Sequence, residues 1–143
     1  MGMQSEQGGQ PAQQTAEKID VFLKARGSGP DLEWDLGLQD PPKEGKEPID
    51  VPPGLGRDIV FHLRSGGPGV NFLPSDPIWV QEGGNCPPKP GSTSGQVSVT
   101  DCKPNKLTIH DVNTEKRDLI YQLNFTGGAP PCDPLIRNGG SFA

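Results

Sequence analysis

The sequence has few of the residues on which metal and cofactor sites depend. It holds two histidines, three cysteines and two methionines. No two of the histidines and cysteines stand at the C-x2-C or H-x3-H spacings that are typical of zinc sites. A blue-copper site needs Cys, His and Met close together in one loop, whereas the methionines are Met1 and Met3 and no histidine follows Cys132. We therefore expect no metal and no cofactor.

A surplus of basic charge and long apolar runs are also missing. Thirteen basic and eighteen acidic residues give a net charge of −5, which disfavours nucleic-acid binding because neutralising phosphates requires a basic surface. No run approaches the roughly 20 apolar residues of a membrane span. The N-terminal stretch lacks the basic start and apolar segment of a signal peptide. The sequence thus predicts a soluble, cytoplasmic protein with no membrane partner, unless a leader was removed.

Catalytic motifs are equally scarce. No serine stands in a G-x-S-x-G pattern, and the glycine-rich stretches GGPGVN and GLGR do not precede a helix that would bind phosphate. One alternative is a small thiol-dependent enzyme or redox protein that uses Cys132 or Cys86 with His110. These residues are far apart in the sequence and have no local signature, so we favour a protein without catalytic activity.

The odd number of cysteines raises a question of redox state. Cys86 and Cys102 flank a loop rich in Pro, Gly and Ser, and a disulfide that closes about 15 residues would stabilise the fold by roughly 3 kcal/mol. In a reducing cytoplasm all three cysteines would be thiols. Because there is no export signal, we favour thiols and keep a Cys86–Cys102 disulfide as the alternative.

Glycine and proline are what the sequence has in quantity. They number 20 and 17 of 143 residues, and only 31% of residues are apolar, which disfavours long helices. After residue 56 the apolar residues gather into short alternating runs bounded by turn residues. We predict a disordered tail over 1–16 and one all-β domain over 17–143, an immunoglobulin-like antiparallel β-sandwich of about seven to nine short strands.

Three segments before residue 65 are expected to be strands. Residues 19–25 fit either a strand or one face of a helix, but a turn signal and a second alternating run follow them, so we favour a hairpin. Residues 39–57 contain five prolines and should form an extended surface loop. The clearest strand is 58–64, whose Ile59, Phe61 and Leu63 face one way.

Residues 106–125, KLTIHDVNTEKRDLIYQLNF, predict a second hairpin. Asp111 and Asn113 come where the chain turns, and Asx side chains in turns accept backbone hydrogen bonds. Period-two spacing gives the residues that should face the core, which are Leu107, Ile109, Leu119, Tyr121, Leu123 and Phe125.

The same polar residues permit a binding interpretation. Asp111, Asn113, Asp133 and Asn138 would present oxygens from neighbouring loops at one end of the sandwich, where calcium or a sugar would bind. Hard-cation sites prefer carboxylates spaced two apart within one loop, and no such run is present. We therefore favour the turn interpretation and expect Arg137 to anchor the last strand.

The aromatic residues leave a similar choice open. Trp34, Trp79 and Tyr121 are expected in the core or at its rim, because large aromatic side chains usually supply buried area. The alternative is a carbohydrate platform on the surface.

The C-terminal motifs carry a resemblance. A Leu-Thr-hydrophobic-x-Asp-x-Asn segment leads into a Tyr-x-Leu strand, and an Asp-Pro-x-Ile-x-Asn segment follows. Over about residues 58–140 the chain resembles small bacterial all-β proteins of the DP-EP type, which have no assigned function. The resemblance implies an immunoglobulin-like sandwich. The positions that match are Leu107, Thr108, Ile109, Asp111, Asn113, Tyr121, Leu123, Asp133, Pro134, Ile136 and Asn138.

These observations lead to an expectation for function. Sandwich domains of this kind commonly bind through loops or through an exposed sheet edge, and uncovered edges pair readily with other strands. We expect a non-catalytic binding or assembly module whose partner is another protein or a second copy of the chain.

Overall fold

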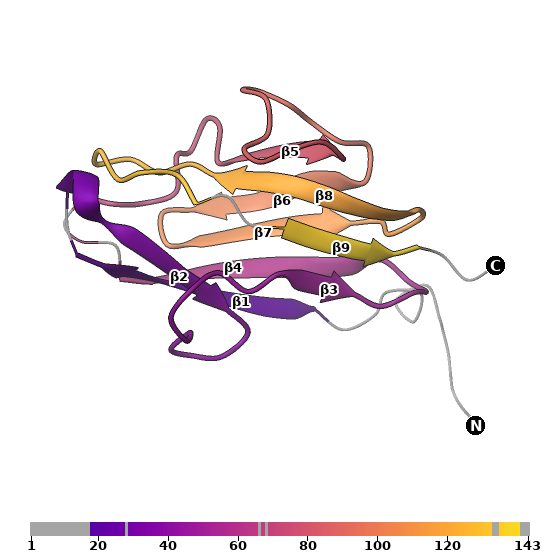
Figure 1. Cartoon of the computed structure of the whole chain (residues 1–143), viewed down its shortest axis with the longest axis horizontal. Coiled ribbons are helices and arrows are strands. Elements are labelled where there is room, and N and C mark those ends of the chain that lie inside the picture. Colours follow the sequence, from indigo (N-terminus) through magenta and orange to yellow (C-terminus); the bar gives the residue numbers. More distant parts are fainter. Residues whose placement is uncertain (1–17, 28, 66, 68, 133–134, 141–143) are drawn as a thin grey trace.

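The computed structural model describes residues 18–27, 29–65, 67, 69–132 and 135–140 (Figure 1). The tail predicted over 1–16 lies outside the described residues. The described part forms one three-residue 3-10 turn, η2 (Gly29–Asp31), and nine strands. These are β1 (Ile19–Arg26), β2 (Glu33–Gly37), β3 (Ile49–Val51), β4 (Arg57–Ser65), β5 (Ile78–Glu82), β6 (Val97–Lys103), β7 (Lys106–Asp111), β8 (Lys116–Leu123) and β9 (Leu135–Gly139).

The strands form two sheets that pack face to face. The five-stranded sheet has the order β2-β1-β4-β7-β6, and the four-stranded sheet has the order β3-β9-β8-β5. Figure 1 shows the four strands of the smaller sheet lying across those of the larger one. Apolar side chains from both sheets make one core, in which the rings of Phe61 and Tyr121 lie 5.6 Å apart. The predicted all-β sandwich is confirmed.

Both sheets are mixed: five of the seven strand pairs among the described residues are antiparallel, as predicted, and two are parallel. β1 pairs with β4 in parallel, and β3 pairs with β9 in parallel. The chain leaves β2 at one edge of the larger sheet, enters β3 in the smaller sheet and returns to β4. Two strands that enter their sheets from the same end run in the same direction, and alternating sequence patterns carry no information about this direction. Immunoglobulin-like connectivity stays a prediction.

The first segment is a strand and the predicted hairpin with β2 is confirmed. Leu23 lies opposite Leu36, and both face the core. Beyond β2, a loop covers the outer edge of the sheet: the Leu36 amide donates to the Gly45 carbonyl over 2.9 Å, and the Glu47 amide donates to the Leu36 carbonyl over 2.8 Å. The proline-rich segment is therefore a loop that also supplies the short strand β3.

The hairpin predicted over residues 106–125 is wrong. β7 belongs to the five-stranded sheet and β8 to the four-stranded sheet, so residues 112–115 cross from one layer to the other. The hairpin is formed instead by β6 and β7. Period-two spacing identifies the face that a strand buries but not the strand with which it pairs. The residues predicted to face the core do so, since five are buried and Phe125 packs partly buried against them.

Candidate functional site

Three of the four predicted oxygen-bearing residues come together, whereas Asp133 lies outside the described residues. Asn138 of β9 donates from Nδ2 to Oδ1 of Asp111 in β7 over 2.8 Å, and the amide of Asn113 donates to the same oxygen over 3.0 Å. The exposed fractions are 0% for Asp111, 0% for Asn113 and 4% for Asn138. Because β7 and β9 belong to different sheets, the cluster links the two layers inside the sandwich.

Asn113 connects this cluster to the surrounding loops. Its backbone has φ of 55°, a left-handed conformation that Asn tolerates better than most residues. Its Nδ2 donates to the carbonyls of Pro52 over 2.8 Å and Leu55 over 3.3 Å, and its Oδ1 accepts from the amide of Gly140 over 2.9 Å. This geometry is that of a closed structural cross-link, as the turn interpretation expects, and a binding role for these residues stays a prediction.

The cluster contains two acceptors without a partner among the described residues. Asp111 Oδ2 and Asn138 Oδ1 are both buried and accept no hydrogen bond. Burial raises the pKa of the Asp111 carboxyl above its ordinary value, while hydrogen bonds from Asn138 and Asn113 and the nearby His110 oppose the rise. A buried carboxylate oxygen without a partner disfavours the charged form, which agrees with the direction in which the pKa of Asp111 is shifted.

The second feature singled out in the sequence, His110, lies on the outer face of the five-stranded sheet. Its Nδ1 is 2.8 Å from Oδ1 of Asp58, directly opposite it in β4. Cys132 is fully buried in the core between the sheets, whereas His110 is partly exposed. The structure thus does not bring together the predicted pair of His110 and Cys132.

The cysteines differ strongly in their surroundings. Cys86 is exposed and Cys102 is half-buried, and both are free thiols in the structure, so the Cys86–Cys102 disulfide is not formed. Burial raises the pKa of the Cys102 thiol, and the neighbouring Asp101 charge raises it further. Because the thiolate is the nucleophile, these surroundings predict an order of reactivity.

We expect Cys86 to react first with iodoacetamide, Cys102 to react about 10-fold more slowly because it is less exposed and less ionised, and Cys132 to react only after unfolding. Peptide mass spectrometry after timed alkylation measures the three rates. If Cys86 and Cys102 both resisted alkylation until a reductant was added, a disulfide would replace this interpretation.

The aromatic residues do not form a common surface, so the alternative of a platform built from all three is wrong. Trp34 is 2% exposed and donates from Nε1 to the Pro130 carbonyl over 2.8 Å, and Tyr121 is 0% exposed. Trp79 alone reaches solvent, from β5 on the outer face of the four-stranded sheet. The predicted core role holds for Trp34 and Tyr121, and Trp79 remains as a surface aromatic.

Trp79 stands at a small crevice of about 280 Å³. It lies directly opposite Gln122 of β8, and Asn124 follows two residues later on the same face. Gln122 and Asn124 are only 7% and 8% exposed. Neither residue was predicted from the sequence, although their spacing of two on the polar face of an alternating strand was a usable signal. The full lining is Leu73, Trp79, Gln122, Asn124, Phe125, Ala129 and Pro131.

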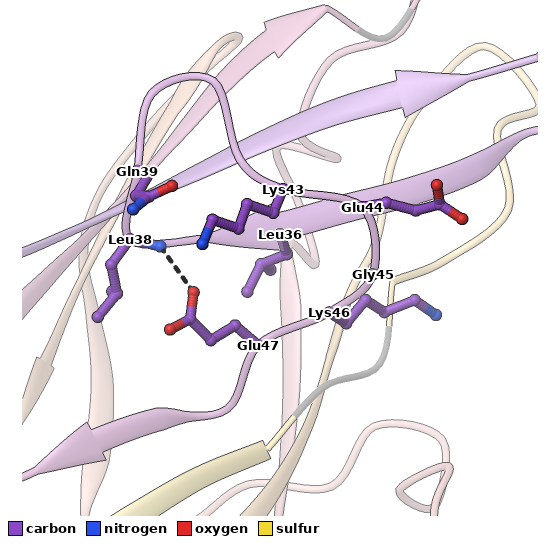
Figure 2. A pocket seen from close by; sticks show the side chains of 8 residues that line it. All are labelled: Leu36, Leu38, Gln39, Lys43, Glu44, Gly45, Lys46 and Glu47. Atoms are coloured by element: carbon purple, nitrogen blue, oxygen red, sulfur yellow. Dashed lines mark hydrogen bonds between the residues drawn. The ribbon is translucent and has the colours of Figure 1, made fainter.

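A larger hollow, of about 510 Å³, lies inside the loop between β2 and β3. Figure 2 shows that Glu44 and Lys46 point away from it, while Glu47 turns inward and accepts a hydrogen bond from the Leu38 amide over 3.3 Å. Lys43 crosses the hollow in the same view. Exposed side chains of both charges diverge here, so the hollow reflects the shape of the loop and offers no convergent set of ligand groups.

The sheet edges differ in how well they are covered. The edge of β5 is covered by the loop after it, since the Val80 amide donates to the Ser92 carbonyl over 3.0 Å. β3 is three residues long and is followed by Pro52 and Pro53. Within the described ranges, by contrast, the seven-residue strand β6 has one backbone hydrogen bond on its outer side, from the Val97 amide at its start to the Ser94 carbonyl over 3.3 Å, and none along Ser98–Lys103.

No protein-family model matches the chain, and a search of curated proteins finds no match either. The resemblance to the DP-EP type therefore stays a prediction. Among the described residues, no helix is long and apolar enough to cross a membrane.

Proposed function

We propose that this protein is a non-catalytic assembly module that pairs through the edge of β6 with the same strand of a second copy. The observation that supports the proposal is that the sheet edges differ in how far loops cover them. Loops of the chain itself cover β2 and β5, whereas β6 offers a row of backbone donors and acceptors to another strand. Unpaired edges of this kind are templates for strand addition.

The side chains of β6 fit such pairing. Val99 lies opposite Ile109, toward the core side of the sheet, yet it is 44% exposed. An antiparallel pair with its two-fold axis at Val99 would place the two valines against each other. Asp101 lies beyond the β-bulge, opposite Thr108 and so on the outer face of the sheet, so the two copies of Asp101 are not opposed across the axis at Val99.

The pairing would close as a dimer. A two-fold contact uses the β6 edge of both copies, and the covered edges of β2 and β5 leave no equivalent template for further growth. A β-bulge between Val99 and Asp101 also limits the length of regular edge. The contact would fall below the roughly 1,600 Å² of standard interfaces, so we expect a dissociation constant between about 10 µM and 1 mM.

Sedimentation velocity from 10 µM to 1 mM tests the proposal, with Val99→Lys as the disrupting variant. Because the substitution places two ammonium groups at the axis, we expect dimerisation to weaken at least 10-fold. Val112→Lys is the matched control, since Val112 is a similarly exposed valine, at 37%, outside β6. It should dimerise like the unaltered protein. The proposal is wrong if the unaltered protein stays monomeric at 1 mM. It is also wrong if Val99→Lys and Val112→Lys change dimerisation equally.

A further inference from the structure

The crevice beside Trp79 has the chemistry of a ligand site. The indole ring of Trp79 is held in place because its Nε1 donates to Oδ2 of Asp76 over 2.7 Å. The neighbouring Asn124 is also fixed, since its Nδ2 donates to the Asp76 carbonyl over 3.0 Å. One residue, Asp76, therefore orients both the aromatic wall and the amide floor of the crevice.

Gln122 also lines the floor of the crevice, and its side-chain amide has hydrogen-bonding groups that no described residue uses. Its Nε2 donates to Oδ1 of Asn124 over 2.7 Å, which uses one of its two N–H groups. No described residue donates to its Oε1, although the side chain is more than nine-tenths buried. This oxygen is not sealed from solvent and opens onto the crevice that Gln122 lines, where a ligand can donate to it.

We infer that this crevice binds a neutral sugar ring. The apolar face of a pyranose packs on an indole, and a pair of adjacent hydroxyls can both donate to an amide oxygen and accept from an amide N–H. The residues that line the crevice carry no charge, which favours an uncharged ligand. Its volume of about 280 Å³ is near the lower end of ligand sites, roughly 300 to 1,000 Å³, and so suits one ring.

This inference is independent of assembly through β6. The crevice lies on the outer face of the four-stranded sheet, whereas β6 is an edge of the other sheet. Sugar binding and dimerisation can therefore succeed or fail separately, and each has its own measurement.

Saturation-transfer-difference NMR tests the inference on the full chain. The probes are methyl α-glucoside, methyl β-galactoside and methyl α-mannoside, each at concentrations up to 50 mM, with sodium glucuronate as a charged comparison. We expect transfer to the ring protons of at least one neutral glycoside, and at least 10-fold weaker binding of glucuronate. Transfer should be strongest at the protons of the sugar face that lies on Trp79.

Two substitutions separate the roles of ring and amide. Trp79→Ala should reduce affinity at least 10-fold, whereas Trp79→Phe keeps an aromatic face and should lose less. Gln122→Met has a similar shape without polar atoms and should weaken binding by about 5- to 10-fold. Near-UV circular dichroism from the buried Trp34 reports whether each variant is folded.

Two results would overturn the inference. One is a lack of saturation transfer to all three neutral glycosides at 50 mM. The other is transfer of undiminished strength in a folded Trp79→Ala or Gln122→Met variant, which would place the sugar elsewhere on the surface.

Discussion

Replacing Asn113 with alanine is expected to destabilise the fold by about 3 to 5 kcal/mol, since each buried group left without a partner costs roughly 1 to 3 kcal/mol. The side chain satisfies the carbonyls of Pro52 and Leu55 and the amide of Gly140. Alanine also tolerates the left-handed backbone at φ of 55° less well than Asn does. Urea unfolding followed by circular dichroism measures the change.

Asn113→Gly separates the two contributions. Glycine loses the same three hydrogen bonds but adopts positive φ without strain, so it should be more stable than the alanine variant by about 1 kcal/mol and still well below the unaltered protein. Val112→Ala, one residue earlier, is an exposed control. A loss below 1 kcal/mol for Asn113→Ala would mean that the crossing of residues 112–115 between the two sheets does not depend on this side chain.

Much of the fold was predictable because alternation reports burial directly. The spacing of Ile59, Phe61 and Leu63 identified the inner face of β4, and that of Leu119, Tyr121 and Leu123 did the same for β8. Which strands pair with each other was not predictable. β7 and β8 would show the same alternation as a hairpin within one sheet or as an arch, in which residues 112–115 cross from one sheet to the other. The arch depends on where Asp111 and Asn113 find partners, and these are residues 52, 55, 138 and 140, far away in the sequence.

The candidate site was predictable only in part, for a related reason. Trp79 was singled out as an aromatic residue, but the sequence around it does not indicate whether the ring is buried. That depends on the other strands, because the inward-facing Tyr121 and the outward-facing Gln122 are neighbours in the same strand. The exposed edge of β6 likewise results from sheet order, which places β6 last in its sheet, and sheet order is not contained in any local pattern.

Asp111→Asn, which removes the charge of Asp111, is expected to stabilise the protein at pH 7. The Asn side chain keeps an acceptor for the Asn113 amide and for Asn138 Nδ2, and its amide nitrogen replaces the buried, unpartnered Oδ2. The substitution thereby removes a buried acceptor without a partner and the charge that burial disfavours. Because an unsatisfied buried group costs roughly 1 to 3 kcal/mol, we expect a gain of about 1 to 2 kcal/mol.

The gain should depend on pH with a definite sign. Burial raises the pKa of Asp111 in the folded state, so as pH rises the unfolded chain loses this proton first, and stability is lost until pH passes the folded pKa. Below the unfolded pKa of about 3.9 both states hold the proton, and a protonated Oδ2 can donate as the Asn amide does. The advantage of Asp111→Asn over the unaltered protein should therefore be small near pH 3.5 and full at pH 7.

Urea unfolding of both proteins between pH 3.5 and pH 8 measures this difference, and the other carboxyl groups cancel because the two chains share them. Asp31→Asn makes the same chemical change at an exposed position and should leave stability within about 0.5 kcal/mol at every pH. The charge of His110 favours ionised Asp111, so His110→Gln should enlarge the advantage of Asn at this site. An Asp111→Asn variant that is less stable at pH 7 would show that ionised Asp111 stabilises the fold, and an equal advantage at every pH would show that folding does not raise the pKa of Asp111.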